Sequence, residues 1–479
     1  MPSKNSCQIY ALEGLSPEVR AVTFAKCSRS DKSFREIAAG LTAENSSKFH
    51  EKWVVGYGHS SVAEHAPISI AMENISLLAV EAIESNRLAS YTEKSSRYQI
   101  YDEDRVYYPS EFKADKTVDK LFRDTIKLQF ALYKKSAKPV QEIIFKENPK
   151  EKDEDQKGYE ARVRSKWIDM CRYLLPNACF ANLGMTANAR TFENALMKWF
   201  SNPLSEVQDI AKQVKKEALR ITPTLVKYAD PNQYLIDSYK ILPKKVKTIL
   251  GAEKKYLGKE TLVELVDFDK DVENKVLAAV IYQFSNIPYK KAYQKARSLK
   301  RADKEKLLDN ILKRIGRHDK PLRAVELPYF TFDCLIDQGA YFDLKRNRIM
   351  TQLPQSVTTK HGYFIPRAMI LAGLEKEYKE VMEKTDKAFK TISKKFPNEA
   401  GYIATKSFAR RFLMKMNLRE LYYFCYYRGA NPGGHVSYRF VGTKMYEITN
   451  KKFPTLMKYL PFIFDMNSKE LNKYFEYID

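Results

Sequence analysis

GHSSVAEH (residues 58–65) and NRLASYTEKSSRY (residues 86–98) are the two motifs that decide the fold of this chain. Between them, residues 65–76 alternate in polarity and are bounded by Pro67 and Asn74, which is typical of a strand. Residues 77–91 then repeat apolar side chains at intervals of three and four, which predicts a helix ending near Arg87. The second motif is therefore expected in a polar loop that follows a helix.

The first motif contains three side chains that could bind a metal ion, His59, Glu64 and His65. No further His or Cys cluster accompanies them, and their spacing matches no standard zinc motif. We therefore expect no metal site, and interpret the motif as a hydrogen-bonded turn.

The second motif combines two arginines, Arg87 and Arg97, with hydroxyl groups and Glu93. Arginine forks and hydroxyl groups are suited to binding a phosphate. Surface salt bridges are the alternative interpretation of the same residues.

Three blocks of sequence recur in the same order, which predicts a diverged tandem duplication. Residues 273–286 resemble residues 18–30, residues 323–356 resemble residues 61–96, and residues 417–428 (NLRELYYFCYYR) resemble residues 188–199. The paired positions Arg87 and Arg348 lie farther apart along the chain than the paired positions Asn188 and Asn417. A charged insertion near residues 140–165 is therefore expected to be largely absent from the second copy.

These motifs resemble the signature of the flavin-dependent thymidylate synthases, which is GHxSxxEH, a helix, and then RHRxASxNExSxRY. In the second copy, KRNRIMTQLPQS (residues 345–356) resembles the RHR segment, and residues 417–428 resemble the family's C-terminal element. In the first copy, CRYLLP (residues 171–176) and NARTFEN (residues 188–194) resemble its RxxLP and NxR elements. Together these blocks span most of the chain.

The resemblance implies an α+β fold with two tandem domains, each an antiparallel sheet with flanking helices. It implies FAD as cofactor, dUMP as the nucleotide, and methylenetetrahydrofolate and NADPH as co-substrates. The family forms homotetramers whose active sites combine residues of several chains. A chain that carries two copies is therefore expected to form a homodimer that imitates the tetramer.

The two copies depart from the family pattern at complementary positions. The RHR triplet is Ser85-Asn86-Arg87 in the first copy and Arg346-Asn347-Arg348 in the second, so its central histidine is absent from both. Glu93 and Arg97 of the first copy correspond to Pro354 and Thr358, whereas Arg428 of the second copy corresponds to Trp199. One composite site could therefore take its nucleotide loop from the first copy and its arginine triplet from the second.

The resemblance assigns roles to residues of this composite site. The nucleotide would contact Glu93, Ser95, Arg97, Arg172, Arg346 and Arg428. Arg428 would also be the catalytic residue, which stabilises negative charge on the pyrimidine. The flavin would contact Ser61, Glu93, Asn194, Arg346, Asn347, Arg348, Asn417 and Arg419, and His59 would lie in the folate or flavin region.

The length of 479 residues exceeds the size at which a single core usually divides. We expect a first domain at residues 1–235, with a charged helical insertion at about 100–165, a linker at 236–265, and a second domain at 266–479. The six cysteines lack metal-ligand spacing, which favours a reducing compartment. The sequence contains neither a secretion signal nor an apolar stretch of about 18 residues, so a cytoplasmic protein without membrane insertion is expected.

The net charge of +23 predicts attraction to anions such as nucleotides, polyglutamylated cofactors or nucleic acid, without choosing among them. Three functions therefore remain open at this point. The first is a flavin-dependent thymidylate synthase, and the second is an enzyme that methylates another pyrimidine nucleotide. The third is a non-catalytic homologue that binds nucleotides or nucleic acid.

Overall fold

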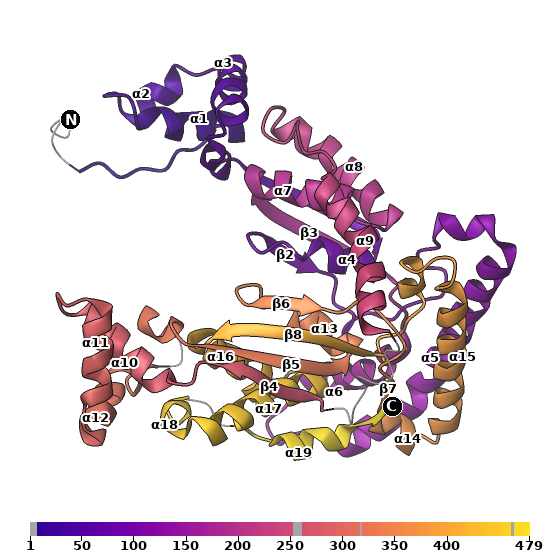
Figure 1. Ribbon diagram of the computed structural model, residues 1–479. Helices are drawn as coiled ribbons and strands as arrows, with labels where there is room; N and C mark the ends of the chain where they lie inside the picture. Colours follow the sequence, from indigo (N-terminus) through magenta and orange to yellow (C-terminus); the bar gives the residue numbers. More distant parts are fainter. Residues whose placement is uncertain (1–6, 252–260, 317–318, 461–463) are drawn as a thin grey trace. The chain divides into compact units, whose positions relative to one another are not determined.

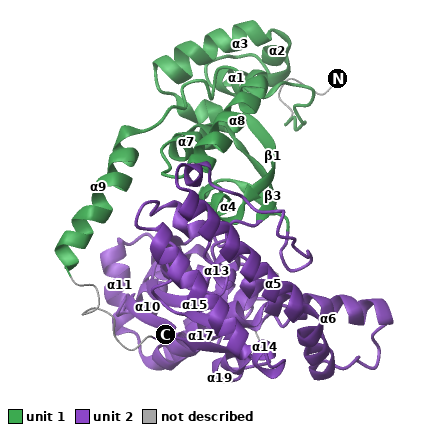
Figure 2. Ribbon diagram, turned by 90° about the vertical axis from the view of Figure 1, so that its right-hand side faces the viewer, with its two compact units in different colours: residues 1–94, 180–253 green, residues 95–179, 254–479 purple. Residues whose placement is uncertain are grey.

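The computed structural model describes residues 7–251, 261–316, 319–460 and 464–479. The chain divides into two compact units, which Figure 2 draws in green and purple. Unit 1 comprises residues 1–94 and 180–253, and unit 2 comprises residues 95–179 and 254–479. The segment 95–179 belongs to the first copy in sequence, yet it packs with the second copy.

Unit 1 is built on a three-stranded antiparallel sheet in the order β1-β3-β2 (Figure 1). Alternate residues of β3 are buried, as a strand with one face on a core requires. Helices α4, α7 and α8 pack against this sheet. The elements are α1 Pro17–Cys27, α2 Phe34–Ala39, α3 Ala43–Phe49, η1 His50–Gly56, η2 Ser60–His65, β1 Pro67–Ser76, α4 Leu77–Ile83, β2 Ser90–Glu93, β3 Phe180–Asn188, α7 Ala189–Phe200, α8 Ser205–Ile221 and α9 Gln233–Leu250.

Unit 2 contains a four-stranded antiparallel sheet in the order β4-β5-β8-β6 and a separate two-stranded ladder of β7 and β9. Helix α17 packs on β4 and β5 of the larger sheet, and α5 lies against α15 (Figure 1). The first-copy segment contributes η3 Ser110–Ala114, α5 Lys116–Glu147, α6 Gln156–Cys171 and η4 Arg172–Leu174.

The second copy contributes the remaining elements of unit 2. They are β4 Val263–Phe268, α10 Val272–Gln283, α11 Tyr289–Ser298, α12 Arg301–Leu312, η6 Arg323–Glu326, β5 Tyr329–Asp337, α13 Gln338–Leu344, β6 Thr351–Pro354, β7 Tyr363–Pro366, α14 Arg367–Leu371, α15 Glu375–Ile392, η7 Glu399–Tyr402, β8 Ala409–Asn417, α16 Leu418–Phe424, η8 Cys425–Ala430, α17 Val436–Lys452, α18 Pro454–Met457, α19 Ser468–Leu471, η9 Asn472–Tyr474 and β9 Phe475–Ile478.

Equivalent elements of the two copies end at positions that the sequence comparison pairs. Strand β1 ends at Ser76 and strand β5 ends at Asp337, and each of these two residues caps the helix that follows. Ser76 and Asp337 are as far apart along the chain as the paired positions Arg87 and Arg348. Strands β3 and β8 end at Asn188 and Asn417, the two asparagines aligned in the sequence, and both are again helix N-caps. The expected α+β duplication is therefore confirmed down to the capping residues.

The expected linker and insertion have regular structure. Helix α9 lies largely within the linker expected at 236–265, where we anticipated a connection; residues 252–260 of that linker lie outside the described part of the chain. Residues 100–165, where a charged helical insertion was expected, include α5 and most of α6. None of the helices in the described part of the chain is both long enough and apolar enough to cross a membrane.

Candidate functional site

A buried ionic cluster in unit 2 contains two of the arginines expected to bind the nucleotide. Arg97 donates from Nε to both oxygens of Asp169, at 3.0 and 2.9 Å, and from Nη2 to Asp169 Oδ2 at 2.7 Å. Arg172 Nε lies 3.2 Å from Asp169 Oδ1 on the other side of the carboxylate. Asp169 and Arg172 are one helical turn apart at the end of α6, so the helix itself brings them together.

The second copy supplies the other wall of this cluster. Arg172 Nη2 lies 3.5 Å from Asp343 Oδ2, and Arg346 Nη1 lies 3.9 Å from Asp343 Oδ1. Lys406 Nζ donates to Ser96 Oγ at 2.8 Å, and Arg172 Nη1 donates to the same hydroxyl group at 3.2 Å. Residues of both copies thus contact one another within a single compact unit.

Arg428 lies at the edge of the same cluster, in the π-helical turn η8 that follows α16. Its guanidinium carbon is 5.4 Å from the ring centre of Tyr438, and its Nε is buried without a hydrogen-bond partner in the described part of the chain. Such π-helical turns often occur at functional sites. The first-copy equivalent, Trp199, lies in the regular helix α7, so the distortion belongs to the copy that carries the arginine.

Two glycines fix the position of this turn against α17. A Cβ atom added to Gly442 would lie 2.6 Å from the backbone nitrogen of Gly429 and 2.8 Å from the carbonyl carbon of Arg428. A side chain at Gly442 would therefore force the backbone that carries Arg428 to move.

The glycine-rich segment after η8 contacts the cluster through a carbonyl group. Gly433 accepts hydrogen bonds from Nη1 and Nη2 of Arg97, each at 3.3 Å. A phosphate cradle would instead present backbone N–H groups to the ligand. The segment is therefore a loop that helps to orient Arg97.

Charges in the cluster are unevenly balanced. Five cationic side chains face three carboxyl groups, which leaves two formal positive charges. The cations are Arg97, Arg172, Arg346, Lys406 and Arg428, and the acids are Asp169, Asp337 and Asp343. Burial opposes ionisation of Asp343, but Arg172, Arg346 and Arg428 outweigh it, so the pKa of Asp343 is lowered. Burial raises the pKa of Asp169 against the opposing effect of Arg172 and Arg97. This arrangement can accept an anion with a charge near −2.

Asp337 is an acid of the cluster whose pKa is raised toward neutral. Burial raises its pKa to about 6, although hydrogen bonds from Ser437, the Ala340 N–H and Tyr173 oppose the change. Since the pKa is higher in the folded than in the unfolded state, the folded state binds the proton more tightly. The contribution of Asp337 to stability is therefore complete below about pH 4 and is lost as the pH rises through about 6.

Replacing Asp337 with asparagine is expected to remove this pH dependence while keeping an acceptor for the Ala340 N–H. The native chain loses the contribution of Asp337 between pH 4 and pH 7.5, and the variant does not. The free energy of unfolding of the variant minus that of the native chain should therefore rise by roughly 2–3 kcal/mol over this range. Urea unfolding across this range measures the difference, with the exposed pair member Asp119→Asn as the control. A stability difference for Asp337→Asn that stays constant with pH would contradict the assignment.

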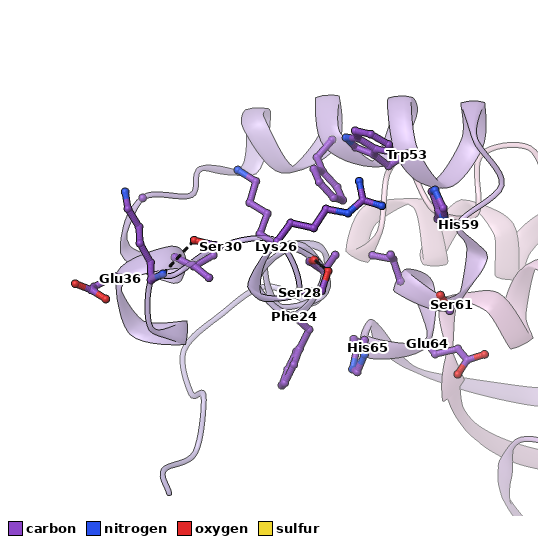
Figure 3. Close-up of a pocket in the computed structure, with 17 residues that line it drawn as sticks. Phe24, Lys26, Ser28, Ser30, Glu36, Trp53, His59, Ser61, Glu64 and His65 are labelled. Atoms are coloured by element: carbon purple, nitrogen blue, oxygen red, sulfur yellow. Dashed lines mark hydrogen bonds between the residues drawn. The ribbon is translucent and has the colours of Figure 1, made fainter. Parts of the chain in front are cut away.

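Unit 1 contains a cavity of about 700 Å³ beside the first motif (Figure 3). Ser61 and His59, expected in the flavin region, both line it. Its aromatic wall is formed by Phe24, Phe49, Trp53, His59 and His65, and its cations are Lys26, Arg29 and Lys32. The volume lies in the range of ligand pockets. Glu36 and Glu64 also line the cavity, but Glu64 is paired with Arg190, so the lining keeps an excess of positive charge that suits a planar aromatic ligand with negative charge.

The three side chains first considered as metal ligands have other partners. Glu64 accepts from Arg190 Nη1 at 2.5 Å, His65 stacks on Phe24 with ring centres 4.5 Å apart, and His59 lies beside Trp53 with ring centres 5.9 Å apart. Within the described ranges, no three His, Cys, Asp or Glu side chains are grouped so as to hold a metal ion.

The Asn and Arg of the NxR element have the same structural partners in both copies. Asn188 Oδ1 accepts from the Thr191 N–H at 2.9 Å, and Asn417 Oδ1 accepts from the Glu420 N–H at 2.8 Å. The matching arginines pair with a glutamate of the preceding short helix, Arg190 with Glu64 of η2 and Arg419 with Glu326 of η6. Asn417 and Arg419 therefore hold α16 and η6 in place, whatever else they contact.

The asparagines that replace the central histidine also share one role. Asn86 Nδ2 donates to the Ile83 carbonyl group at 3.0 Å, and Asn347 Nδ2 donates to the Leu344 carbonyl group at 3.0 Å. Each amide thus satisfies a carbonyl group at the end of a helix. Asn347 has this structural role in addition to the flavin contact that was expected of it.

The expected site residues are divided between the two units. Unit 1 holds Ser61, Glu93, Asn194 and His59, and unit 2 holds Ser95, Arg97, Arg172, Arg346, Asn347, Arg348, Asn417, Arg419 and Arg428. In unit 1, Asn194 lies exposed on α7 and donates to the Arg190 carbonyl group at 3.0 Å, and it does not line the cavity. In unit 2, Arg97, Arg172, Arg346 and Arg428 do gather in one cluster.

Sequence reasoning missed the acids and the lysine of this cluster. The separation of three residues between Asp169 and Arg172, and between Asp343 and Arg346, was a usable signal, because residues three apart on a helix are neighbours. Lys406 is brought in by the β-bridge that joins Pro176 and Thr405, and no local pattern announces it.

Comparison with known proteins identifies the family. The thymidylate synthase complementing protein family (Thy1) matches residues 12–224 and again residues 264–455. A UPF0159 protein of Chlamydia muridarum is 31% identical over 97% of this chain and 93% of its own length. A flavin-dependent thymidylate synthase of Clostridium tetani is 28% identical over 45% of this chain and 84% of its own length.

Among solved structures, the chain is similar to the flavin-dependent thymidylate synthase ThyX of Helicobacter pylori, complexed with FAD and dUMP. The match has 17% sequence identity and a TM-score of 0.30, and it covers 46% of this chain and 96% of that chain. The assignment rests on the sequence matches, which occur twice along the chain. The chain belongs to the Thy1 family and carries two diverged copies of its domain in tandem.

Proposed function

We propose that this chain is a flavin-dependent thymidylate synthase that methylates dUMP to dTMP with methylenetetrahydrofolate and NADPH. The observation that carries the proposal is the cluster in unit 2, where Arg97 and Arg172 of the first copy meet Arg346 and Arg428 of the second. Its two formal positive charges match a nucleotide phosphate, which carries nearly two negative charges at pH 7.

Each residue of the cluster has a role in this proposal. Asp169 holds the guanidinium of Arg97 from one side, so that Nη1 is available to a phosphate oxygen that would replace the 3.3 Å contact with Gly433. Arg172 and Arg346 would complete the phosphate site, together with the hydroxyl of Ser95. Arg428, held by η8 against Tyr438, would face the pyrimidine and stabilise its negative charge during the reaction.

FAD would supply the redox chemistry of the reaction when bound. The cavity of unit 1 suits such a group, because aromatic rings and three cations line it together with two acids. Ser61 and His59 line this cavity and would contribute to holding the cofactor there. The family resemblance also assigns flavin contacts to Arg346, Asn347, Arg348, Asn417 and Arg419 of the second copy. We further propose a cytoplasmic homodimer.

The test is the absorption spectrum of the purified chain after incubation with FAD and desalting. Retained flavin whose spectrum shifts on titration with dUMP is expected, followed by dTMP formation once methylenetetrahydrofolate and NADPH are added. UMP and dCMP serve as matched nucleotides, and a response to one of these alone would assign a different pyrimidine substrate. A colourless protein that also fails to bind dUMP in calorimetry would contradict the proposal.

A further inference from the structure

The end of helix α10, helix α11 and the loop between them carry a largely exposed strip of aromatic and basic side chains outside the cluster described above. The strip consists of Tyr282, Phe284, Tyr289, Lys290, Tyr293 and Arg297. Figure 1 shows α10, α11 and α12 packed side by side. Ala292 and Ala296 are buried on α11, whereas Lys290 and Arg297 are exposed. Tyr289 and Tyr293 lie beside the buried face, where Tyr289 is exposed and Tyr293 is half-buried.

The aromatic rings of the strip form a row. The ring centres of Tyr282 and Tyr289 are 6.2 Å apart, and those of Tyr289 and Tyr293 are 6.3 Å apart with nearly parallel planes at 28°. Tyr282 is 53% exposed, and Phe284 in the loop is 70% exposed. Large aromatic side chains in a row at a surface are costly to leave in water, so the row favours a partner that covers them.

Cations outnumber the acids around this row. No Asp or Glu occurs between Glu273 and Asp303, whereas this interval contains seven Lys or Arg residues. Lys275 pairs with Asp269, and Arg301 pairs with Glu273 and Glu305. The other five lie exposed and form no ion pair within the described residues; they are Lys290, Lys291, Lys295, Arg297 and Lys300.

The nearest carboxylates are occupied. Asp271 accepts from the Tyr293 hydroxyl group at 2.5 Å and from Asn274 Nδ2 at 2.7 Å, and Asp269 accepts from the Tyr329 N–H at 2.8 Å in addition to its pair with Lys275. Asp271 keeps its negative charge because both of its partners are neutral, but the five cations without an ion pair outnumber it, so the strip has a net positive charge beside the row of rings.

The equivalent surface of the first copy lacks this combination. Helix α2 begins at Phe34 and helix α11 begins at Tyr289. These two residues are as far apart along the chain as Glu18 and Glu273, which begin the first pair of similar blocks, so α2 is the first-copy equivalent of α11. In the first copy, Asp31 and Glu36 flank this helix start, and Ala38 takes the place of Tyr293. The strip is thus a property of the second copy alone.

We propose that this strip binds single-stranded nucleic acid, with the cations on backbone phosphates and the rings of Tyr282, Phe284 and Tyr289 stacked on bases. A row of exposed rings within a basic surface is the combination that single-strand binding requires, because every base has a stacking face and every linkage a negative charge. An acidic protein would match the charge but would not use the row of rings. The strip is separate from the nucleotide cluster, so the proposal does not depend on the proposed enzyme activity.

Fluorescence anisotropy of labelled dT20 and U20 with the full chain tests this proposal. The variant Lys290→Glu/Arg297→Glu is expected to weaken binding at least tenfold and to reduce its salt dependence. The variant Lys384→Glu/Lys387→Glu makes the same charge change on the exposed face of α15 and should weaken binding less than threefold. The variant Phe284→Ser is expected to weaken binding about tenfold without changing the salt dependence.

Each alternative outcome would overturn the proposal. The first is that the native chain does not bind dT20 or U20 at 50 mM salt. The second is that the α11 and α15 charge variants lose the same amount of affinity. The third is that the chain binds duplex DNA as tightly as dT20 and that Phe284→Ser has no effect. Binding of anionic vesicles in preference to dT20 would assign the strip to a membrane surface instead. The far-UV circular dichroism spectrum and the urea unfolding midpoint of each variant, measured in parallel, show that the chain remains folded.

Discussion

Replacing Arg172 with leucine is expected to lower the free energy of unfolding of unit 2 by about 3–5 kcal/mol. The Arg172 side chain is 4% exposed and is paired with Asp169 and Asp343, which are 3% and 13% exposed. Leucine fills much of the space but removes one cation from two buried carboxylates, so that Asp169 keeps only Arg97 and Asp343 keeps only the more distant Arg346. Removing one member of a buried ion pair is more costly than the pair itself is stabilising, because the remaining charge is not solvated.

Urea unfolding followed by hydrogen exchange of amides in α6 and α13 measures this loss in unit 2. The control is Arg123→Leu, which breaks an exposed pair with Asp119 on α5 and should cost less than about 1 kcal/mol. A loss for Arg172→Leu no larger than that of the control would show that the cluster does not stabilise the unit.

Replacing Arg97 with alanine is expected to weaken dUMP binding by about 10- to 100-fold. Hydrogen bonds to charged groups contribute about 1.5–3 kcal/mol, and each 1.4 kcal/mol is tenfold in affinity. Asp169 retains Arg172 as a partner in this variant, so the fold should lose less stability than in Arg172→Leu. Arg97→Lys keeps the charge but loses the two-pronged contact, so an intermediate affinity is expected.

Calorimetry with dUMP measures the effect, and Arg164→Ala is the matched control because Arg164 is exposed on α6 of the same unit. The control removes the same charge at a distance from the cluster. An Arg97→Ala variant with native affinity would remove Arg97 from the nucleotide site.

The repeated parts of the fold could be predicted from the sequence because the signals are local. Asn188 and Asn417, which the sequence comparison pairs, end β3 and β8 in the structure, and each caps the helix that follows. A residue that terminates a strand and caps the next helix keeps its place even when its neighbours diverge. The helical insertion expected at about 100–165 rested on charged composition alone, and α5 and most of α6 lie in this range.

The assignment of chain segments to compact units could not be predicted in this way. Segment 95–179 leaves its own copy and packs with the second, through contacts such as Gln129 Nε2 with Thr385 Oγ1 at 3.1 Å. No short-range pattern encodes a partner 256 residues away. The acids Asp169 and Asp343 were missed for a related reason, because family motifs record the arginines that ligands select and not the side chains that hold them.

The stoichiometry of dUMP binding to the full chain tests the central claim most directly. If Arg97 and Arg172 of the first copy and Arg346 and Arg428 of the second form one composite site, calorimetry with FAD-loaded protein will show one dUMP per chain. Arg97→Ala and Arg428→Ala will then each weaken that single binding event. Two equivalent dUMP per chain, or two classes of site that each respond to one variant only, would contradict the composite site and assign separate sites to the two copies.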